Sequence, residues 1–283
     1  MNWLDEGSLY SQISAFLRED LGRGDITSQA IVARNTRARG RFVAGEKMVV
    51  AGLEAAEEVF LTLDPQQQLE AFVSEGEEIE AGKVIARVVG FADVLLSGER
   101  VALNLLQRLS AVATVTSAFV KLVAGTGVAI VDSRETTPGL RMLEKYAVLL
   151  GGGSASNFGL DDSVVITANH AAISGNMQTA VKNAKERLGS LHKIRVQVSS
   201  ESELREALEG GADILQLHGL TPEEVARLVP IAREGARGGI QCSGEITLAN
   251  VRAYAEAGVD TISINLLNNS ARGVAVSFKM QPC

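Results

Sequence analysis

Six short apolar segments, each followed by a stretch with helical spacing, fill the second half of the chain. The segments are rich in valine and isoleucine and lie at 128–132, 163–167, 194–198, 213–218, 239–243 and 260–265. The helical patterns lie at 139–150, 177–188, 201–209, 221–234 and 247–257. Strands that are apolar throughout and alternate with helices indicate a parallel sheet covered by helices. Repeated units of this kind predict a parallel α/β barrel. A doubly wound sheet is the alternative, but the first strand lacks the glycine-rich turn of that fold.

The first half of the chain has a different pattern. Residues 9–21 have helical spacing, and residues 36–90 contain short alternating runs cut by glycines, with one helical stretch, "LEAAEEVFLTL", among them. A long apolar helix is expected over 97–123. We therefore predict an N-terminal mixed α/β sandwich domain over 1–110 and the barrel domain over 111–270. The last residues of the chain are candidates to pack on the first domain.

The net charge of −7 and the lack of any lysine or arginine run argue against a nucleic-acid surface. Cys242 and Cys283 lie far apart without metal-ligand spacing, which favours free thiols in a reducing compartment. The acidic N-terminus lacks a signal pattern, and no apolar stretch is long enough to span a bilayer. We expect a cytoplasmic protein that acts on a small molecule and binds neither nucleic acid nor membrane.

In a parallel barrel the reactive side chains lie where the strands end. The candidates that follow the six strands are Asp132, Arg134, Glu135, Thr167, Asn169, His170, Gln197, Ser199, Gln216, His218, Cys242, Ser243, Glu245 and Asn265. Several have structural alternatives: Asp132 can cap the turn at Ser133, and His170 can serve as a hydrogen-bonded loop residue. Glu245 stands between Gly244 and Ile246, where a long carboxylate has no evident packing role.

The segment "DSRETTPGLRMLEKYAVLLGGG" at 132–153 combines charged residues, a turn and a helix. Pro138-Gly139 fits a type II turn, in which glycine accepts a positive φ. The three glycines at 151–153 either end the helix or let a ligand approach the backbone.

This segment, together with "LREDLGRGDIT", "GERVALNLLQRLSAVAT", "LREALEGGADILQL" and "ITLANVRAYAEAGVDTISI", resembles quinolinate phosphoribosyltransferase, also called carboxylating nicotinate-nucleotide pyrophosphorylase. The resemblance covers nearly the whole chain. It implies a mixed α/β domain, an α/β barrel, and a homodimer whose active sites borrow residues from the neighbour. The implied reaction joins quinolinate to the ribose of phosphoribosyl pyrophosphate and releases pyrophosphate and carbon dioxide.

The resemblance also implies which residues bind substrate. Arg100 matches an arginine that such dimers offer to the partner's site, Arg134 matches an arginine of the substrate pocket, and Arg141 and Lys145 are retained. Other positions depart from the family pattern. Glu135 and Thr167 replace lysines, Ala155-Ser156-Asn157 replaces Asn-His-Arg, Gln197 and His218 replace carboxylates, and Glu245 and Asn265 replace glycines. Each lost charge-assisted contact to an anion costs roughly 1.5–3 kcal/mol.

These departures predict a rebuilt active site for a small carboxylate or heteroaromatic substrate other than quinolinate, with phosphoribosyl transfer or a decarboxylase or lyase step. Glu135, His218 and Glu245 are the predicted catalytic residues. The predicted substrate-binding residues are Arg100, Arg134, Arg141, Lys145, His170, Gln197 and Asn265. Two alternatives remain: a non-catalytic relative that binds a ligand or partner, and a genuine nicotinate-nucleotide pyrophosphorylase. The sequence assigns no cofactor and no metal ligand. Magnesium is expected only if phosphoribosyl pyrophosphate still binds.

Overall fold

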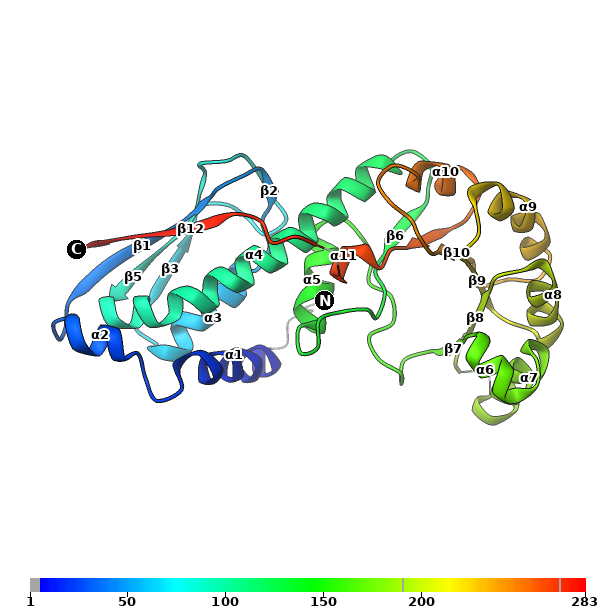
Figure 1. Cartoon of the computed structure of the whole chain (residues 1–283), viewed down its shortest axis with the longest axis horizontal. Helices are drawn as coiled ribbons and strands as arrows, with labels where there is room; N and C mark the ends of the chain where they lie inside the picture. The colour runs from blue at the N-terminus through cyan, green and yellow to red at the C-terminus, as the bar shows by residue number, and fades with distance from the viewer. Residues whose placement is uncertain (1–5, 190, 270) are drawn as a thin grey trace. The chain divides into compact units, whose positions relative to one another are not determined.

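The computed structural model describes residues 6–189, 191–269 and 271–283 (Figure 1). Contacts divide the chain into two compact units. Unit 1 takes the described residues of 1–117, 137–152 and 270–283, and unit 2 takes 118–136 and 153–269. Compact units are not the same as independently folding domains, so the predicted boundary between residues 110 and 111 stays a prediction.

Unit 1 is built on an antiparallel four-stranded sheet. Its strand order is β12 (Val276–Pro282), β1 (Arg37–Ala44), β5 (Val84–Phe91) and β3 (Gln68–Ala71). A separate two-stranded antiparallel sheet is formed by β2 (Met48–Val49) and β4 (Glu78–Ile79). Alternate residues of β1 are buried, so one face of this strand points into the core. The last strand of the chain pairs with β1, which places Phe278 opposite Phe42.

The helices of unit 1 are α1 (Glu6–Leu21), α2 (Ile26–Ile31), α3 (Leu53–Leu63), α5 (Arg141–Leu150) and most of α4 (Ala92–Leu122). The rings of Phe42, Phe60 and Phe278 form the aromatic centre of the core, with the Phe42 and Phe278 centroids 4.6 Å apart. Gly40 is required here, because a Cβ at this position would lie 1.9 Å from the Phe278 ring.

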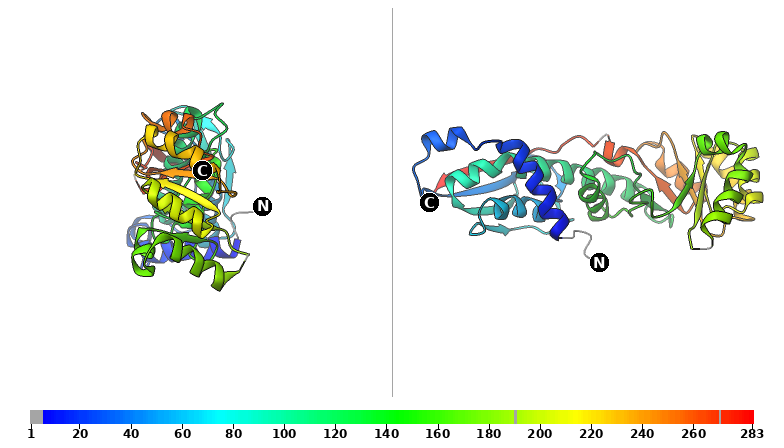
Figure 2. Two further views of the ribbon diagram at one scale, coloured as in Figure 1. Left: turned by 90° about the vertical axis from the view of Figure 1, so that its right-hand side faces the viewer. Right: turned by 90° about the horizontal axis from the view of Figure 1, so that it is seen from below.

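Unit 2 contains a six-stranded parallel sheet, which confirms the predicted parallel α/β fold. Its strand order is β6 (Ala129–Val131), β11 (Thr261–Ser263), β10 (Ile240–Ser243), β9 (Ile214–His218), β8 (Ile194–Val198) and β7 (Val164–Ile166). Helices α7 (Met177–Leu188), α8 (Glu201–Gly210), α9 (Pro222–Arg233) and α10 (Val251–Glu256) follow the strands in turn. The green to yellow helices α7, α8 and α9 lie on one side of the strands (Figures 1 and 2).

Helix starts in unit 2 follow local capping chemistry. Thr221 and Glu224 form a capping box at the start of α9. The predicted start of a helix at Thr247 is wrong, because Thr247–Asn250 forms a turn in which the Thr247 N–H donates to Asn250 Oδ1. Helix α10 begins only at Val251. Two short helices, α6 (Ala168–Ser174) and α11 (Leu266–Asn269), were not predicted.

Candidate functional site

The carboxyl ends of the unit 2 strands surround a cavity of about 240 Å³, hereafter the barrel cavity. Its polar lining consists of two guanidinium groups, one carboxylate, one imidazole, amides and hydroxyls. These groups belong to Arg134, Glu135, Arg195, Gln197, Gln216, His218, Gln241, Ser243, Ser263 and Asn265, among others. The cavity is smaller than a typical ligand site, so it suits a small polar ligand.

The register of the sheet brings these side chains together. Gln197 pairs with Gln216, and Gln216 pairs with Gln241, so three amides stand in one row across β8, β9 and β10. Two residues further along, His218 pairs with Ser243. Residues in register on neighbouring parallel strands point to the same face of the sheet. The alternation of strands "IRVQV", "ILQLH" and "IQCS" therefore accounts for a polar interior.

His218 is part of a hydrogen-bonded chain. Gln216 Nε2 donates to Ser243 Oγ at 2.8 Å, and this oxygen lies 3.0 Å from His218 Nδ1. A hydroxyl that accepts from Gln216 can donate its own proton to Nδ1, which favours the tautomer with the proton on Nε2. The exposed imidazole can then offer Nε2–H to a ligand. The predicted role of His218 in proton transfer stays a prediction.

Arg195 is the charged residue of strand β8, whose sequence is "IRVQV". Its guanidinium donates to Gln241 Oε1 at 3.1 Å and to Asn157 Oδ1 at 2.5 Å. Burial lowers the pKa of Arg195, the nearby Asp162 counteracts this, and the charge of Arg134 lowers the pKa further. Two positive charges thus face the barrel cavity. Sequence reasoning missed Arg195, although a charged residue two positions before Gln197 in an apolar strand was a usable signal.

Two loops support the cavity. Asp162 accepts from Asn157 Nδ2 at 2.8 Å, which holds the amide that binds Arg195. Asp132 is fully buried, and its Oδ1 accepts from the Ser156 N–H at 2.6 Å. Asp132 therefore ties the end of β6 to the segment 153–156, which agrees with a structural role for this residue. The segment Ala155-Ser156-Asn157 has a scaffold function that its sequence did not indicate.

The two predicted catalytic glutamates do not line the same cavity. Glu135 lines the barrel cavity, and its Oε2 accepts from Asn269 Nδ2 at 3.1 Å. Glu245 lines a wider depression of about 960 Å³ on the same unit. His218 and Asn265 line both spaces. Glu135 and Glu245 therefore line different spaces, and His218 lines both of them.

His170 lies outside the barrel cavity. It is exposed, and its Nδ1 accepts from the Thr167 N–H at 3.2 Å, which completes a capping box at the start of α6. It lines another depression, of about 600 Å³, together with Arg134. His170 therefore makes a structural hydrogen bond, as the alternative interpretation of its loop position proposed. A role in substrate binding stays a prediction.

The remaining predicted binding residues belong to unit 1. Arg100 is exposed on α4, Arg141 opens α5 and is half-buried, and Lys145 is fully buried on the same helix. The participation of these residues in substrate binding stays a prediction.

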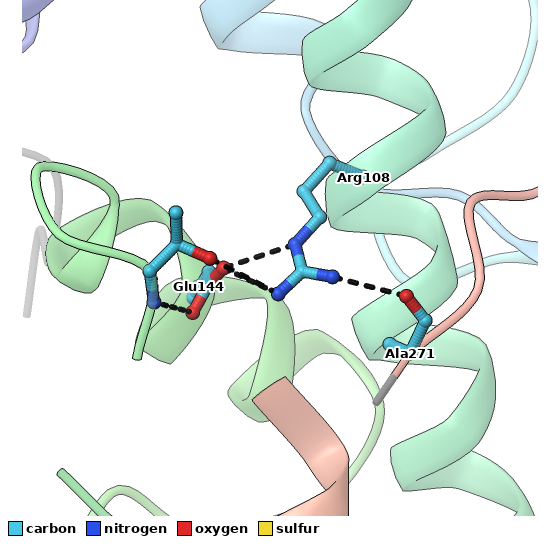
Figure 3. Close-up of polar contacts among 4 residues, drawn as sticks. Arg108, Glu144 and Ala271 are labelled. Carbon is cyan, nitrogen blue, oxygen red and sulfur yellow. Dashed lines mark hydrogen bonds and ion pairs between the residues drawn. The ribbon is translucent and has the colours of Figure 1, made fainter. Parts of the chain in front are cut away.

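A network around Arg108 fixes the turn before α5 (Figure 3). Arg108 Nε and Nη2 donate to Glu144 Oε1 at 2.9 and 2.7 Å, and Nη1 donates to the carbonyl of Ala271 at 3.0 Å. Glu144 Oε2 accepts from the Thr137 N–H at 3.1 Å. Gly139 has φ 85°, as the predicted type II turn requires. The network thus positions the helix that carries Arg141 and Lys145.

Comparison with known proteins identifies the family of this chain. A family model described as quinolinate phosphoribosyl transferase, C-terminal domain, matches residues 112–280, and the corresponding N-terminal domain model matches residues 25–110. The chain belongs to the quinolinate phosphoribosyl transferase family.

Relatives in this family share most of their length with the chain. A protein of Bacillus subtilis, named probable nicotinate-nucleotide pyrophosphorylase (carboxylating), is 38% identical over 266 residues, which cover 94% of this chain and 91% of the relative. A Synechocystis protein of the same name is 39% identical over 254 residues, covering 89% and 85%. The solved nicotinate-nucleotide pyrophosphorylase from Francisella tularensis is 32% identical, with a TM-score of 0.91 over 98% of both chains.

These names bear on the three hypotheses drawn from the sequence. They favour the alternative of a genuine nicotinate-nucleotide pyrophosphorylase over the predicted change of substrate. The predicted rebuilding of the family's active site stays a prediction. Within the described residues, no group of three or more His, Cys, Asp or Glu side chains is placed to hold a metal ion. In the same residues, no helix is both long and apolar enough to cross a bilayer.

Proposed function

We propose that this protein is a phosphoribosyltransferase of the nicotinate-nucleotide pyrophosphorylase type. In the proposed reaction, the ring nitrogen of a pyridine carboxylate forms a bond to C1 of the ribose while the bond from C1 to the pyrophosphate oxygen breaks. With quinolinate as acceptor, the carboxyl group next to the nitrogen then leaves as carbon dioxide, and a proton takes its place on the ring.

The observation that carries this proposal is the match of both family domains over residues 25–110 and 112–280. The relatives that share about nine-tenths of the chain bear the name of this activity. A cytoplasmic location and a homodimer in which Arg100 serves the partner's site are part of the same proposal.

The barrel cavity supplies groups for the acceptor. Arg134 and Arg195 provide positive charge for a carboxylate, and Gln241 provides an amide beside them. His218, with its Nε2 free to donate, can protonate the ring carbon or a leaving oxygen. Glu135, held by Asn269, can accept a proton at the edge of the cavity. Magnesium would enter with the pyrophosphate group, since one lining carboxylate does not make a protein-held site.

A second candidate is the transfer of phosphoribose to an acceptor with a single carboxylate. The charge balance of the barrel cavity supports it, because two guanidiniums and one carboxylate leave about one positive charge for the ligand. Quinolinate brings two carboxylates, so its charge exceeds the surplus of about one positive charge in this lining. Like charges in a partly buried site disfavour binding.

Pyrophosphate release distinguishes these candidates. The purified protein is incubated with phosphoribosyl pyrophosphate and magnesium, and with quinolinate, nicotinate or nicotinamide as acceptor. Turnover with quinolinate supports the family reaction, and turnover with nicotinate alone supports the second candidate. Arg134→Gln should lower kcat/KM for the active acceptor roughly 10- to 150-fold, the loss of one charge-assisted contact. Release with neither carboxylate would overturn the proposal and favour a non-catalytic relative.

A further inference from the structure

Arg195 carries a charge that the described part of the protein does not neutralise by direct contact. Its two acceptors, Asn157 and Gln241, are both neutral amides. The nearby carboxylate of Asp162 is engaged by Asn157 and by the backbone N–H groups of Phe158 and Gly159. Arg195 is half-buried, so its guanidinium loses part of its hydration, and a contacting anion would offset that loss.

The hydrogen-bond capacity of Arg195 is also incompletely used. A guanidinium has five N–H donors, and the bonds to Gln241 and Asn157 use one on each terminal nitrogen. The Nε atom is buried and has no hydrogen-bond partner. Arg195 lines the barrel cavity together with Arg134, whose positive charge opposes its own. The repulsion between the two guanidiniums is relieved when an anion lies between them.

We propose that Arg195 is a specificity-determining residue that binds a carboxylate of the acceptor inside the barrel cavity, with Arg134 as the second cation. This rests on the proposed phosphoribosyltransferase function and names the group that selects its substrate. A planar carboxylate accepts two parallel N–H bonds from one guanidinium, and the donors left on Arg195 allow this fork.

The surroundings favour a carboxylate over a phosphate. The cavity of about 240 Å³ contains two cations and one carboxylate, and its other polar groups are neutral amides and hydroxyls. Pyrophosphate carries more negative charge than this balance offsets. A single carboxylate matches the surplus of about one positive charge. Neutral donors such as Gln241 Nε2 and Ser263 Oγ can complete the shell of its oxygens.

Asn157 is the positioning residue of this subsite. Its amide donates to Asp162 Oδ1 and accepts from Arg195 Nη2, so it fixes the side chain of Arg195 without contacting the ligand. Asp162 in turn accepts from the backbone N–H groups of Phe158 and Gly159. The Asn157 amide thus links Asp162 to Arg195, while each terminal nitrogen of the guanidinium keeps a second N–H that these bonds do not use.

Calorimetric titration with nicotinate and nicotinamide tests the assignment, because the two probes differ in the charge of one group. Wild type, Arg195→Gln and Arg195→Lys are compared, with Arg205→Gln as control, since Arg205 is exposed and pairs with Glu201 on α8. Arg195→Gln should weaken nicotinate binding 10- to 100-fold and leave nicotinamide unchanged. Arg195→Lys should retain part of the affinity, and the control should match wild type. Unchanged thermal melting shows that each variant is folded.

Three outcomes overturn the assignment. They are nicotinate binding within twofold of wild type in Arg195→Gln, no binding of nicotinate or quinolinate by wild type at 10 mM (roughly the weakest useful affinity), or an Arg195 effect confined to inorganic pyrophosphate. Pyrophosphate release separates this proposal from the proposed function. Turnover with an Arg195-independent KM removes the subsite alone. Arg195-dependent carboxylate binding without any turnover removes the phosphoribosyl transfer and leaves the subsite.

Discussion

Individual residues in this protein illustrate how burial changes the chemistry of a charged group. In unit 1, the carboxylate of Glu75 lies at the start of α3 and accepts from the N–H groups of Gly52 and Leu53 at 3.0 and 2.6 Å. A carboxylate at a helix N-terminus is stabilised by the free N–H groups there. Burial outweighs that effect and raises the pKa of Glu75 from 4.5 to about 7.

This shift predicts a pH dependence of stability. The folded carboxyl group keeps its proton to higher pH than the unfolded one, so the free energy of unfolding should fall as pH rises from about 4.5 to about 7. The ceiling of the loss is about 3 kcal/mol, at about 1.4 kcal/mol per pKa unit. Glu75→Gln keeps the carbonyl acceptor and removes the titration. Urea unfolding of both proteins between pH 4.5 and 8 should show curves that converge or cross. Parallel curves would refute the shift.

The Asn157 amide allows a second prediction at this scale. Asn157→Ala removes the bond that orients Arg195 but leaves its charge in place. We expect nicotinate affinity to fall about 3- to 10-fold, corresponding to one hydrogen bond of about 1 kcal/mol. Asn157→Asp should instead place a carboxylate on Arg195 and compete with the ligand. Equal affinities for wild type and Asn157→Ala, measured by calorimetry, would remove the positioning role.

At the scale of elements, the predictable parts are those with strong periodicity. The six parallel strands agree with the apolar segments of the sequence, and α7, α8 and α9 agree with the helical patterns. The short helices were not predicted, because too few residues contribute to their periodic pattern. Helix α2 depends on the cap by Asp25, and α6 depends on the Thr167–His170 capping box. Such local hydrogen bonds are visible in sequence only as common residue types.

The location of the candidate site was predictable from the sequence, but the set of residues that line it was less so. The strand-end rule found Arg134, Glu135, Gln197 and His218, which line the barrel cavity. It missed Arg195, because this residue stands inside a strand and not after it. It also could not separate Glu135 from Glu245, since the sequence does not show which side of His218 each loop occupies.

The packing of α5 against α4 predicts a sensitive glycine. A Cβ on Gly151 would lie 2.5 Å from the Ala113 carbonyl oxygen and 2.6 Å from Thr116 Cβ, although the φ of −74° suits any residue. Gly151→Ala should therefore lower the free energy of unfolding by about 1–3 kcal/mol through overpacking. The matched control is Gly273→Ala, since a Cβ there meets no atom within 4 Å. Similar melting temperatures of the two variants would contradict this packing account.

The Arg108–Glu144 pair predicts a larger loss. Glu144 is fully buried, and neutralising it removes the carboxylate charge that Arg108 contacts at 2.7 Å (Figure 3). Glu144→Gln should cost about 3–5 kcal/mol, as for other broken buried pairs. The exposed pair of Glu201 and Arg205 offers the control, and Glu201→Gln should cost about 0.5 kcal/mol or less. Chemical denaturation measures both. Equal losses would mean that Arg108 and Glu144 act as an ordinary surface pair.

At the scale of the whole molecule, both family domains are present and the sequence resemblance extends over nearly the whole chain. The fold alone does not determine the reaction, because function depends on the residues at the site. The relatives' names and the groups in the barrel cavity together support phosphoribosyl transfer to a carboxylated ring. Both candidate reactions require phosphoribosyl pyrophosphate as the donor, whichever acceptor is used.

Calorimetric titration of the purified protein with phosphoribosyl pyrophosphate, with and without magnesium, is therefore the most direct test. The account predicts saturable, magnesium-dependent binding with a dissociation constant in the micromolar range, which corresponds to about −8 kcal/mol. Such binding would establish the donor that every version of the proposed reaction requires. Absence of heat in both titrations, from a protein that melts cooperatively, would contradict phosphoribosyl transfer altogether.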